Sequence, residues 1–141
     1  MRIFLFAKSF KAKHLVIGEL GEKLVVRHLK KMGLEILRVN YRVHGVGEID
    51  IIARDGSCLV FVEVKTRQNS EYARPGEAVN HDKQSKLWKT SRVFLRELGN
   101  PKIRFRFDVA EVYYKSRFNK KIIYLSNAFS VENIRKDSRY Y

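Results

Sequence analysis

The sequence contains a single cysteine, Cys58, among 141 residues. One thiol excludes an intramolecular disulfide and a metal site built from several thiolates of one chain, and it fits a reducing, cytoplasmic setting. The histidines show no metal-ligand spacing; they are His14, His28, His44 and His81. The chain also lacks a glycine-rich nucleotide-phosphate loop. These absences exclude thiolate metal centres and the common nucleotide-binding classes.

Long hydrophobic runs are absent from the amino end. The apolar piece Ile3 to Ala7 is shorter than the core of a signal peptide and far shorter than a membrane span. We therefore predict no membrane span. Residues 1–13 are expected to form a basic arm, either extended or an edge strand, whose lysines add to a phosphate-binding charge.

Acidic residues are scarce, because 29 Lys and Arg stand against 15 Asp and Glu, a net charge of +14. Such an excess repels itself and indicates a polyanionic partner. Nucleic acid is the expected partner, since Lys and Arg neutralise phosphates in non-specific binding. A merely basic soluble protein or a peripheral membrane binder is the alternative from composition.

The chain length suits one α/β domain, for which we predict residues 14–133, followed by a polar tail at 134–141. Apolar residues at helical spacing and runs of β-forming residues predict the order helix, three strands, helix, two strands. The predicted segments are a helix at 14–32 capped by Gly33, strands at 34–43, 48–53 and 58–65, a loop at 68–80, a helix at 82–98, and a hairpin turning at 117–119. A mixed sheet flanked by helices follows.

The stretch GEIDIIARDGSCLVFVEVKTR places charges inside two hydrophobic strands. With Asp55 and Gly56 as loop residues, alternation puts Glu48, Asp50 and Ile52 on one face and Ile49, Ile51 and Ala53 on the other. This register sets Asp50 opposite Phe61, with Glu63 as a diagonal neighbour about 7 to 8 Å away between backbones. Asp50, Glu63 and Lys65 then share a face.

Two carboxylates at that separation can converge on one cation. Mg²⁺ takes oxygen ligands from one or two carboxylates, with water and substrate phosphate completing its shell. Lys65 follows on the same side, where it could offset the charge of an attacking hydroxide or of a pentavalent phosphorus. The alternative is an ordinary ion pair of Lys65 with Glu63 or Glu48, which would be worth little.

Glu22 and the start of the second helix have two interpretations each, and Asp108 has one. Glu22, on the flank of the first helix's apolar stripe, either points toward the metal or is a solvated rim residue favoured by the helix dipole. Asp108 is expected to pair with Arg104 and Arg106. At the start of the second helix lie Lys83, Gln84 and Lys86. These residues either bind a phosphate at the helix N-terminus or form a basic face exposed to solvent.

The same stretch resembles the YraN-like family, small members of the restriction-endonuclease-like, or PD-(D/E)xK, nuclease superfamily, which is similar to archaeal Holliday junction resolvases. The segments GELGEKLVVRHLKKMGLEILRVNYR, GEAV, DKQSKLWKTSRVFL and RFDVAEV follow in the family's order, so the resemblance covers about residues 14–114. It implies an αβββαβ core around a mixed sheet. The residue before Asp50 is Ile49 rather than proline, a position that varies in the superfamily.

The resemblance implies that Asp50, Glu63 and the carbonyl of Val64 hold Mg²⁺ or Mn²⁺. Lys65 would orient the attacking water, and Glu22 would bind a second ion or a water. Nucleic acid would be contacted by Lys83, Gln84, Lys86 and Arg67. The expected function is a metal-dependent endonuclease acting on DNA, including branched DNA, with a homodimer as in junction-cutting enzymes.

Two other functions stay open. One is a nucleic-acid-binding protein that keeps the nuclease-like fold without turnover. The other is a structural or membrane-associated interaction protein, which would bind DNA weakly and without the steep salt dependence of phosphate contacts.

Overall fold

The computed structural model describes the backbone of residues 2–68 and 79–137, and the side chains of residues 13–68 and 79–134. Within these ranges the elements are α1 (Arg2–Lys31), β1 (Glu35–Val43), β2 (Gly47–Asp55), β3 (Cys58–Arg67), α2 (His81–Glu97), β4 (Arg104–Ser116), β5 (Asn119–Phe129) and α3 (Val131–Asp137). The predicted αβββαβ core is confirmed. Most of the predicted loop at 68–80 lies outside the described residues.

The strands form a five-stranded sheet in the order β1-β2-β3-β4-β5. Neighbouring strands pair antiparallel except β3 and β4, which are parallel. A parallel pair needs a crossover connection, and α2 lies in the chain between these two strands. The mixed sheet that the sequence predicts is therefore confirmed.

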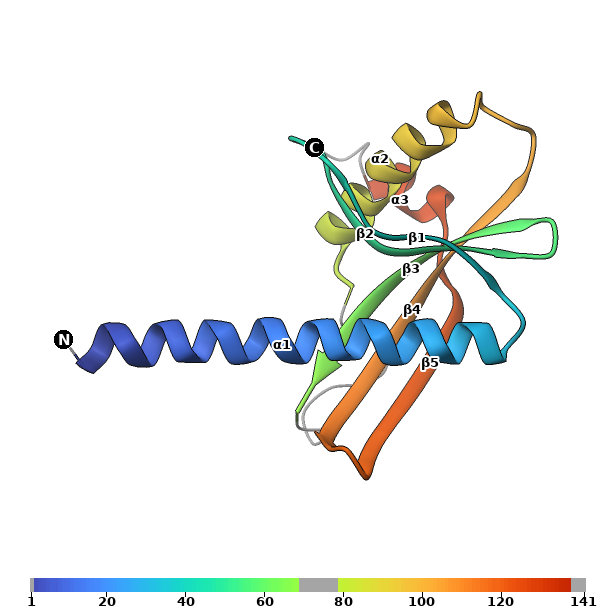
Figure 1. Cartoon of the computed structure of the whole chain (residues 1–141). Coiled ribbons are helices and arrows are strands. Elements are labelled where there is room, and N and C mark those ends of the chain that lie inside the picture. The colour runs from blue at the N-terminus through green and yellow to red at the C-terminus, as the bar shows by residue number, and fades with distance from the viewer. Residues whose placement is uncertain (1, 69–78, 138–141) are drawn as a thin grey trace.

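Helices cover both faces of the sheet (Figure 1). On one face, α1 packs over a core cluster that contains Val25 and Leu29 together with Val60 and Val62. On the other face, α2 and α3 cover a second cluster, to which they contribute Leu87, Phe94 and Ile134. The β3 strand is buried on both faces, which explains why its sequence, CLVFVEVKTR, begins as a continuous apolar run.

The carboxyl end of α1 is fixed by Gly33. Its φ of 90° lies in the left-handed region that favours glycine, and its N–H donates to the carbonyl of Lys30. The N–H of Leu34 donates to the carbonyl of Leu29 at 3.0 Å, which completes a Schellman motif. The predicted cap is confirmed, and the buried Leu34 leads directly into β1.

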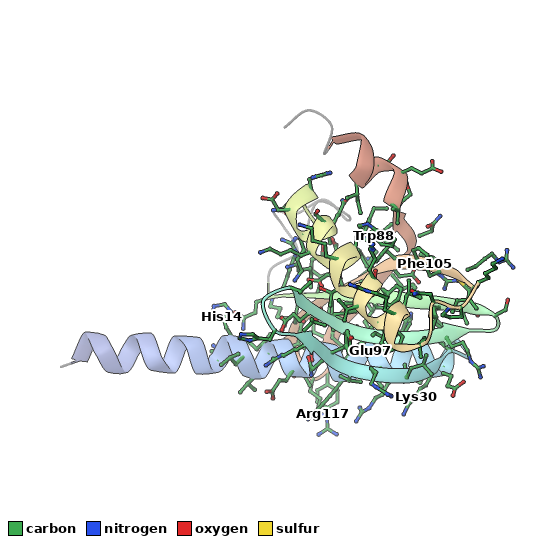
Figure 2. All side chains as sticks on the ribbon, turned by 90° about the horizontal axis from the view of Figure 1, so that it is seen from above. His14, Lys30, Trp88, Glu97, Phe105 and Arg117 are labelled. Carbon is green, nitrogen blue, oxygen red and sulfur yellow. The ribbon has the colours of Figure 1, made fainter. Side chains whose placement is uncertain are left out.

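The α2 side of the core is rich in aromatic rings. Trp88 of α2 stacks on Phe105 of β4, with ring centroids 5.7 Å apart (Figure 2). Phe61 at the centre of the sheet contacts the rings of Phe94 and Phe107. Asn80 caps α2 by accepting the N–H of Lys83 at 3.0 Å, so the helix begins one residue before the predicted start.

The predictions for the two ends of the chain were wrong in conformation. Residues 2–13 were expected to be extended, but α1 begins at Arg2 and its first half projects beyond the sheet (Figure 1). This stretch contains neither glycine nor proline, so nothing in it interrupts a helix. At the other end, the expected polar tail at 134–141 begins within α3, and Ile134 is buried in the core. None of the helices in the described ranges is long and apolar enough to cross a membrane.

The hairpin between β2 and β3 has a different register from the predicted one. Asp55 pairs with Cys58, so the loop residues are Gly56 and Ser57 rather than Asp55 and Gly56. Gly56 has a φ of 57°, and glycine at the first loop position is typical of a type II′ turn. Ile52 therefore lies opposite Phe61, and Asp50 does not.

Candidate active site

The sheet is irregular at Asp50. The pairs Val39–Ile51 and Tyr41–Ile49 place Asn40 opposite Asp50, and Asn40 has a φ of 52°. The ladder between β2 and β3 ends at the pair Ile51–Val62. Ile49 packs in the α2-side cluster with Ile52, although simple alternation predicted that it would share a face with Ile51. The pleat is thus interrupted where the carboxylate sits.

Asp50 occupies the place where the ladder stops. Its Oδ2 accepts the backbone N–H of Val64 at 2.7 Å, so the carboxylate substitutes for a strand partner. The N–H and C=O of one strand residue point to the same side, so the Val64 carbonyl is directed into the same gap. The continued register makes Glu63 the next residue opposite Asp50, closer than the predicted diagonal position.

Glu63 is a buried carboxylate between two cations. Its side chain is 4% exposed, and its Oε1 lies 3.6 Å from Lys65 Nζ and 3.4 Å from Lys83 Nζ. Its Oε2 is buried and accepts no hydrogen bond from the described residues. A buried acceptor without a donor costs about 1–3 kcal/mol, so this oxygen is the atom in the site that most needs a partner.

The two acids repel each other at close range. Burial raises the pKa of Asp50, against the hydrogen bond from Val64, which lowers it. Burial and then the charge of Asp50 raise the pKa of Glu63 to about 7, although Lys83 and Lys65 oppose the shift. A cation between the carboxylates would relieve both causes, so the donor set fits a hard divalent metal.

Glu22 reaches the site from α1. Gly21 brings the helix close to β3, because a Cβ at this position would lie 1.8 Å from Thr66 Oγ1. Burial and then the charge of Asp50 raise the pKa of Glu22, while a hydrogen bond with Asn40 lowers it. Glu22 also lines a surface groove of about 510 Å³, with His14, Leu15, Gly18, Glu19, Asn40, Arg42 and Glu48. This position agrees with the interpretation in which Glu22 points toward the acids, rather than with that of a solvated rim residue.

Within the described residues, no three His, Cys, Asp or Glu side chains gather closely enough to hold a metal by themselves. A metal here would depend on Asp50, Glu63 and a backbone carbonyl, with water or substrate as further ligands. The role predicted for Glu22 stays a prediction.

The four residues predicted to contact nucleic acid lie in different surroundings. Lys83 is drawn to Glu63, and Gln84 Nε2 donates to the carbonyl of Val79 at 3.0 Å. Lys86 is exposed on α2. Arg67 continues the Glu63 and Lys65 face of β3, and its Nε is buried without a hydrogen-bond partner in the described part of the chain. Of these four residues, Lys83 therefore has the direct contact with the acids in the described part of the chain.

Sequence reasoning missed two residues near the site. Glu111, fully buried, pairs in register with Lys65 across the parallel ladder and accepts a hydrogen bond from the Tyr113 hydroxyl at 2.9 Å. A carboxylate within the apolar run of β4 was the signal that could have identified it. Asn40 carried no such signal, because its contact depends on a left-handed backbone that the sequence does not specify.

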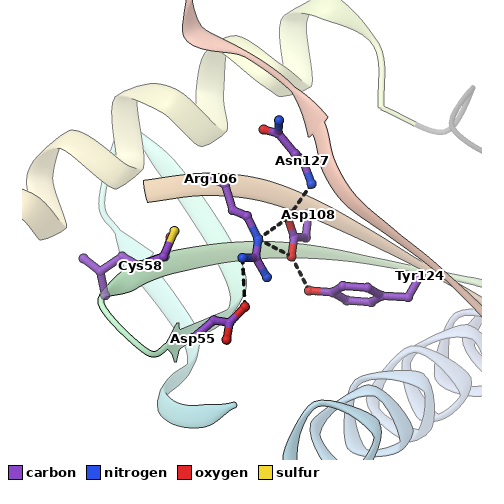
Figure 3. A network of polar contacts seen from close by, with 7 residues as sticks. Asp55, Cys58, Arg106, Asp108, Tyr124 and Asn127 are labelled. Atoms are coloured by element: carbon purple, nitrogen blue, oxygen red, sulfur yellow. Dashed lines mark hydrogen bonds and ion pairs between the residues drawn. The ribbon is translucent and has the colours of Figure 1, made fainter. Parts of the chain in front are cut away.

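Asp108 has a structural role away from the acids. It accepts from Arg106 Nε at 3.1 Å, from the Tyr124 hydroxyl, and from the Asn127 backbone at 2.7 Å (Figure 3). Arg106 also contacts Asp55 at 2.9 Å. The predicted pairing with Arg106 is confirmed, whereas no such contact to Arg104 is found among the described residues. This network fastens β4 to β5 and to the β2–β3 turn.

The raised pKa of Glu63 predicts a pH-dependent stability without metal. In the unfolded chain Glu63 ionises near its ordinary pKa of 4.5, whereas in the folded protein it keeps its proton up to about 7. The folded state thus binds more protons between these values, and its stability falls as the pH rises through this window by at most about 3 kcal/mol. Urea unfolding in EDTA at pH 5 and pH 8 measures the loss. Glu63→Gln should show a smaller loss, and equal losses would contradict the prediction.

The residues of the candidate site lie within the part of the chain that matches a known protein family. Residues 21–112 match the model of "Uncharacterised protein family UPF0102". A UPF0102 protein of Alkaliphilus metalliredigens is 45% identical over 113 residues, which cover 80% of this chain and 96% of that protein. A UPF0102 protein of Caldicellulosiruptor bescii is 43% identical over 115 residues, with 80% and 96% covered. One from Clostridium botulinum is 41% identical over 117 residues, with 82% and 94% covered.

Proposed function

Because this chain belongs to the UPF0102 family, the YraN family of the restriction-endonuclease-like nuclease superfamily, we propose that it is a metal-dependent endonuclease that hydrolyses DNA phosphodiester bonds. The names of the relatives assign no activity, so the proposal rests on the site. The observation that carries it is the buried Oε2 of Glu63, which has no hydrogen-bond partner among the described residues and lies beside the carboxylate of Asp50. Two buried acids facing each other stabilise no fold by themselves, but they suit a cation.

The residues around the acids have separate roles in this proposal. Asp50, Glu63 and the Val64 carbonyl would hold Mg²⁺ or Mn²⁺, and Glu22 would hold a second ion or a water. The metal, when bound, would lower the pKa of a water and polarise the phosphate. Lys65 Nζ, 3.6 Å from Glu63, would orient the water and offset the charge that develops on the phosphate oxygens.

Lys83 gives the site a second cation, from the first turn of α2. Its Nζ lies 3.4 Å from Oε1 of Glu63. With a divalent ion held by Glu63, Lys83 would be available to a phosphate of the substrate. Arg67 and Lys86 would extend the phosphate contacts, and the net charge of +14 supports a polyanionic substrate.

The test is cleavage of a labelled four-way junction and of its matching linear duplex, at low salt, with Mg²⁺, Mn²⁺ or EDTA. We expect cutting with either metal and none with EDTA. The two DNAs separate a junction-cutting enzyme from a general nuclease. Cutting that persists in EDTA would contradict a metal-dependent mechanism.

A second candidate function is a nucleic-acid-binding protein without turnover. It is favoured by the two lysines that already neutralise Glu63 Oε1 and by the lack of a third acid in the group within the described residues. In this case all DNAs would be bound with steep salt dependence and none would be cut with any metal.

A further inference from the structure

The turn between β4 and β5 carries a basic tip, defined here as residues 115–121. Its sequence, KSRFNKK, contains four basic residues and no acidic one. Every residue of the tip is exposed. These cations repel one another, and an anionic partner would offset this repulsion.

Phe118 stands at the centre of the basic tip and is 94% exposed, which makes it the most exposed of the large hydrophobic side chains described. The Arg117 guanidinium carbon lies 5.7 Å from its ring centroid. Among the described residues, Phe118 belongs to neither core cluster, so packing does not account for an aromatic at this position. Figure 2 shows Arg117 at the periphery, far from Trp88 and Phe105.

An exposed aromatic among cations is the arrangement that binds unpaired nucleic acid. The cations follow the phosphates, while the ring offers a face on which a base can stack. In an intact duplex the bases are already stacked on one another, so a ring gains little there. The basic tip therefore distinguishes nucleic acid with an unpaired base from a continuous duplex.

The distance from the acids to the basic tip determines how far the unpaired base would lie from the cleaved bond. Val109 is the register partner of Glu63, and Ser116 at the end of β4 lies seven residues further along the strand. At about 3.3 Å per residue, the tip lies about 23 Å from Glu63 along the strand. This length equals the rise of about seven base pairs, at about 3.4 Å each.

We propose that Phe118 stacks on an unpaired base while the basic tip holds the flanking phosphates, so that the substrate is DNA with a single-stranded or branched segment about seven nucleotides from the cleaved bond. The stacking stands on the basic tip alone, whereas the distance to the cleaved bond rests on the proposed function. The partner is therefore a nucleic acid with a break in its stacking.

The experiment measures binding by the full chain in EDTA, where no cleavage occurs. The DNAs are a continuous duplex and a duplex with a short single-stranded gap. Wild type is expected to prefer the gapped DNA about tenfold, within the range that one base–aromatic contact provides. Phe118→Ala should lose this preference and keep its duplex affinity, whereas Phe118→Trp should retain it. Leu98→Ala, which removes another exposed apolar side chain, is the matched control and should behave as wild type.

Equal preference in wild type and Phe118→Ala would overturn the proposal. So would a change of oligomeric state in Phe118→Ala with unchanged DNA preference, because the basic tip would then be a contact between copies of the chain. Since binding is measured without metal, absence of cleavage would overturn only the proposed enzyme and leave the Phe118 result intact.

Discussion

Replacing Lys65 by alanine is expected to lower the cleavage rate about 10³-fold, the size of effect seen when a group that stabilises charge in the transition state is removed. Lys65 follows Glu63 on the same face of β3, with its Nζ 3.6 Å from the acid. In the proposed mechanism, this is the place where the attacked phosphate would meet the metal. DNA affinity should change little, because Lys65 is one of 29 basic residues. Single-turnover cleavage and binding in EDTA separate the two quantities.

Controls decide whether Lys65 acts in the reaction or in general binding. Lys89→Ala removes an exposed lysine of α2 and should leave cleavage unchanged. Asp50→Asn and Glu63→Gln should lower cleavage at least as much as Lys65→Ala does, because each removes part of one site. Cleavage at the wild-type rate in a clean preparation of Lys65→Ala would assign the activity to a contaminating nuclease.

Replacing Asp108 by alanine should destabilise the protein by about 3–5 kcal/mol, a large part of the stability of a small domain. Its side chain is fully buried and accepts hydrogen bonds from Arg106, Tyr124 and the Asn127 backbone (Figure 3). Alanine would leave these donors without their acceptor and a guanidinium without its closest counter-charge. Urea unfolding at pH 7 measures the loss.

Asp55→Ala is the matched control for this network. Asp55 contacts the same Arg106 at 2.9 Å, but its side chain is 48% exposed, so water replaces the lost contact. We expect a loss below about 1 kcal/mol. Similar losses for the two variants would show that burial does not decide the strength of this network.

The sequence predicted most of the fold, because its patterns reflect which faces are buried. The apolar stripe with Val25 and Leu29, and the cap at Gly33, identified the part of α1 that packs on the sheet. The run from Leu59 to Val62 identified a central strand. These features depend on periods of 3.6 and 2 residues, which a sequence displays directly.

Other features depended on contacts that are distant in the sequence. The loop at Gly56 and Ser57 was misplaced by one residue, since Asp55-Gly56 and Gly56-Ser57 both suit two-residue turns. The predicted alternation of faces fails at Ile49 because the sheet is irregular at Asn40 and Asp50. The closeness of Glu63 and Lys65 was predicted from the sequence, but the approach of Lys83 to Glu63 requires the crossover through α2, which no local pattern encodes.

The strand order, in which every strand pairs with its neighbour in the chain, has a consequence for the order of folding. The β1–β2–β3 meander and the β4–β5 hairpin close through short turns, whereas β3 and β4 meet only after the longer segment that contains α2 has closed. Asp50 and Glu63 therefore meet early, within the local meander, and their repulsion opposes its closure. Lys65 lies within the meander, whereas Lys83 arrives with the crossover, so the late step of folding supplies the second cation beside Glu63.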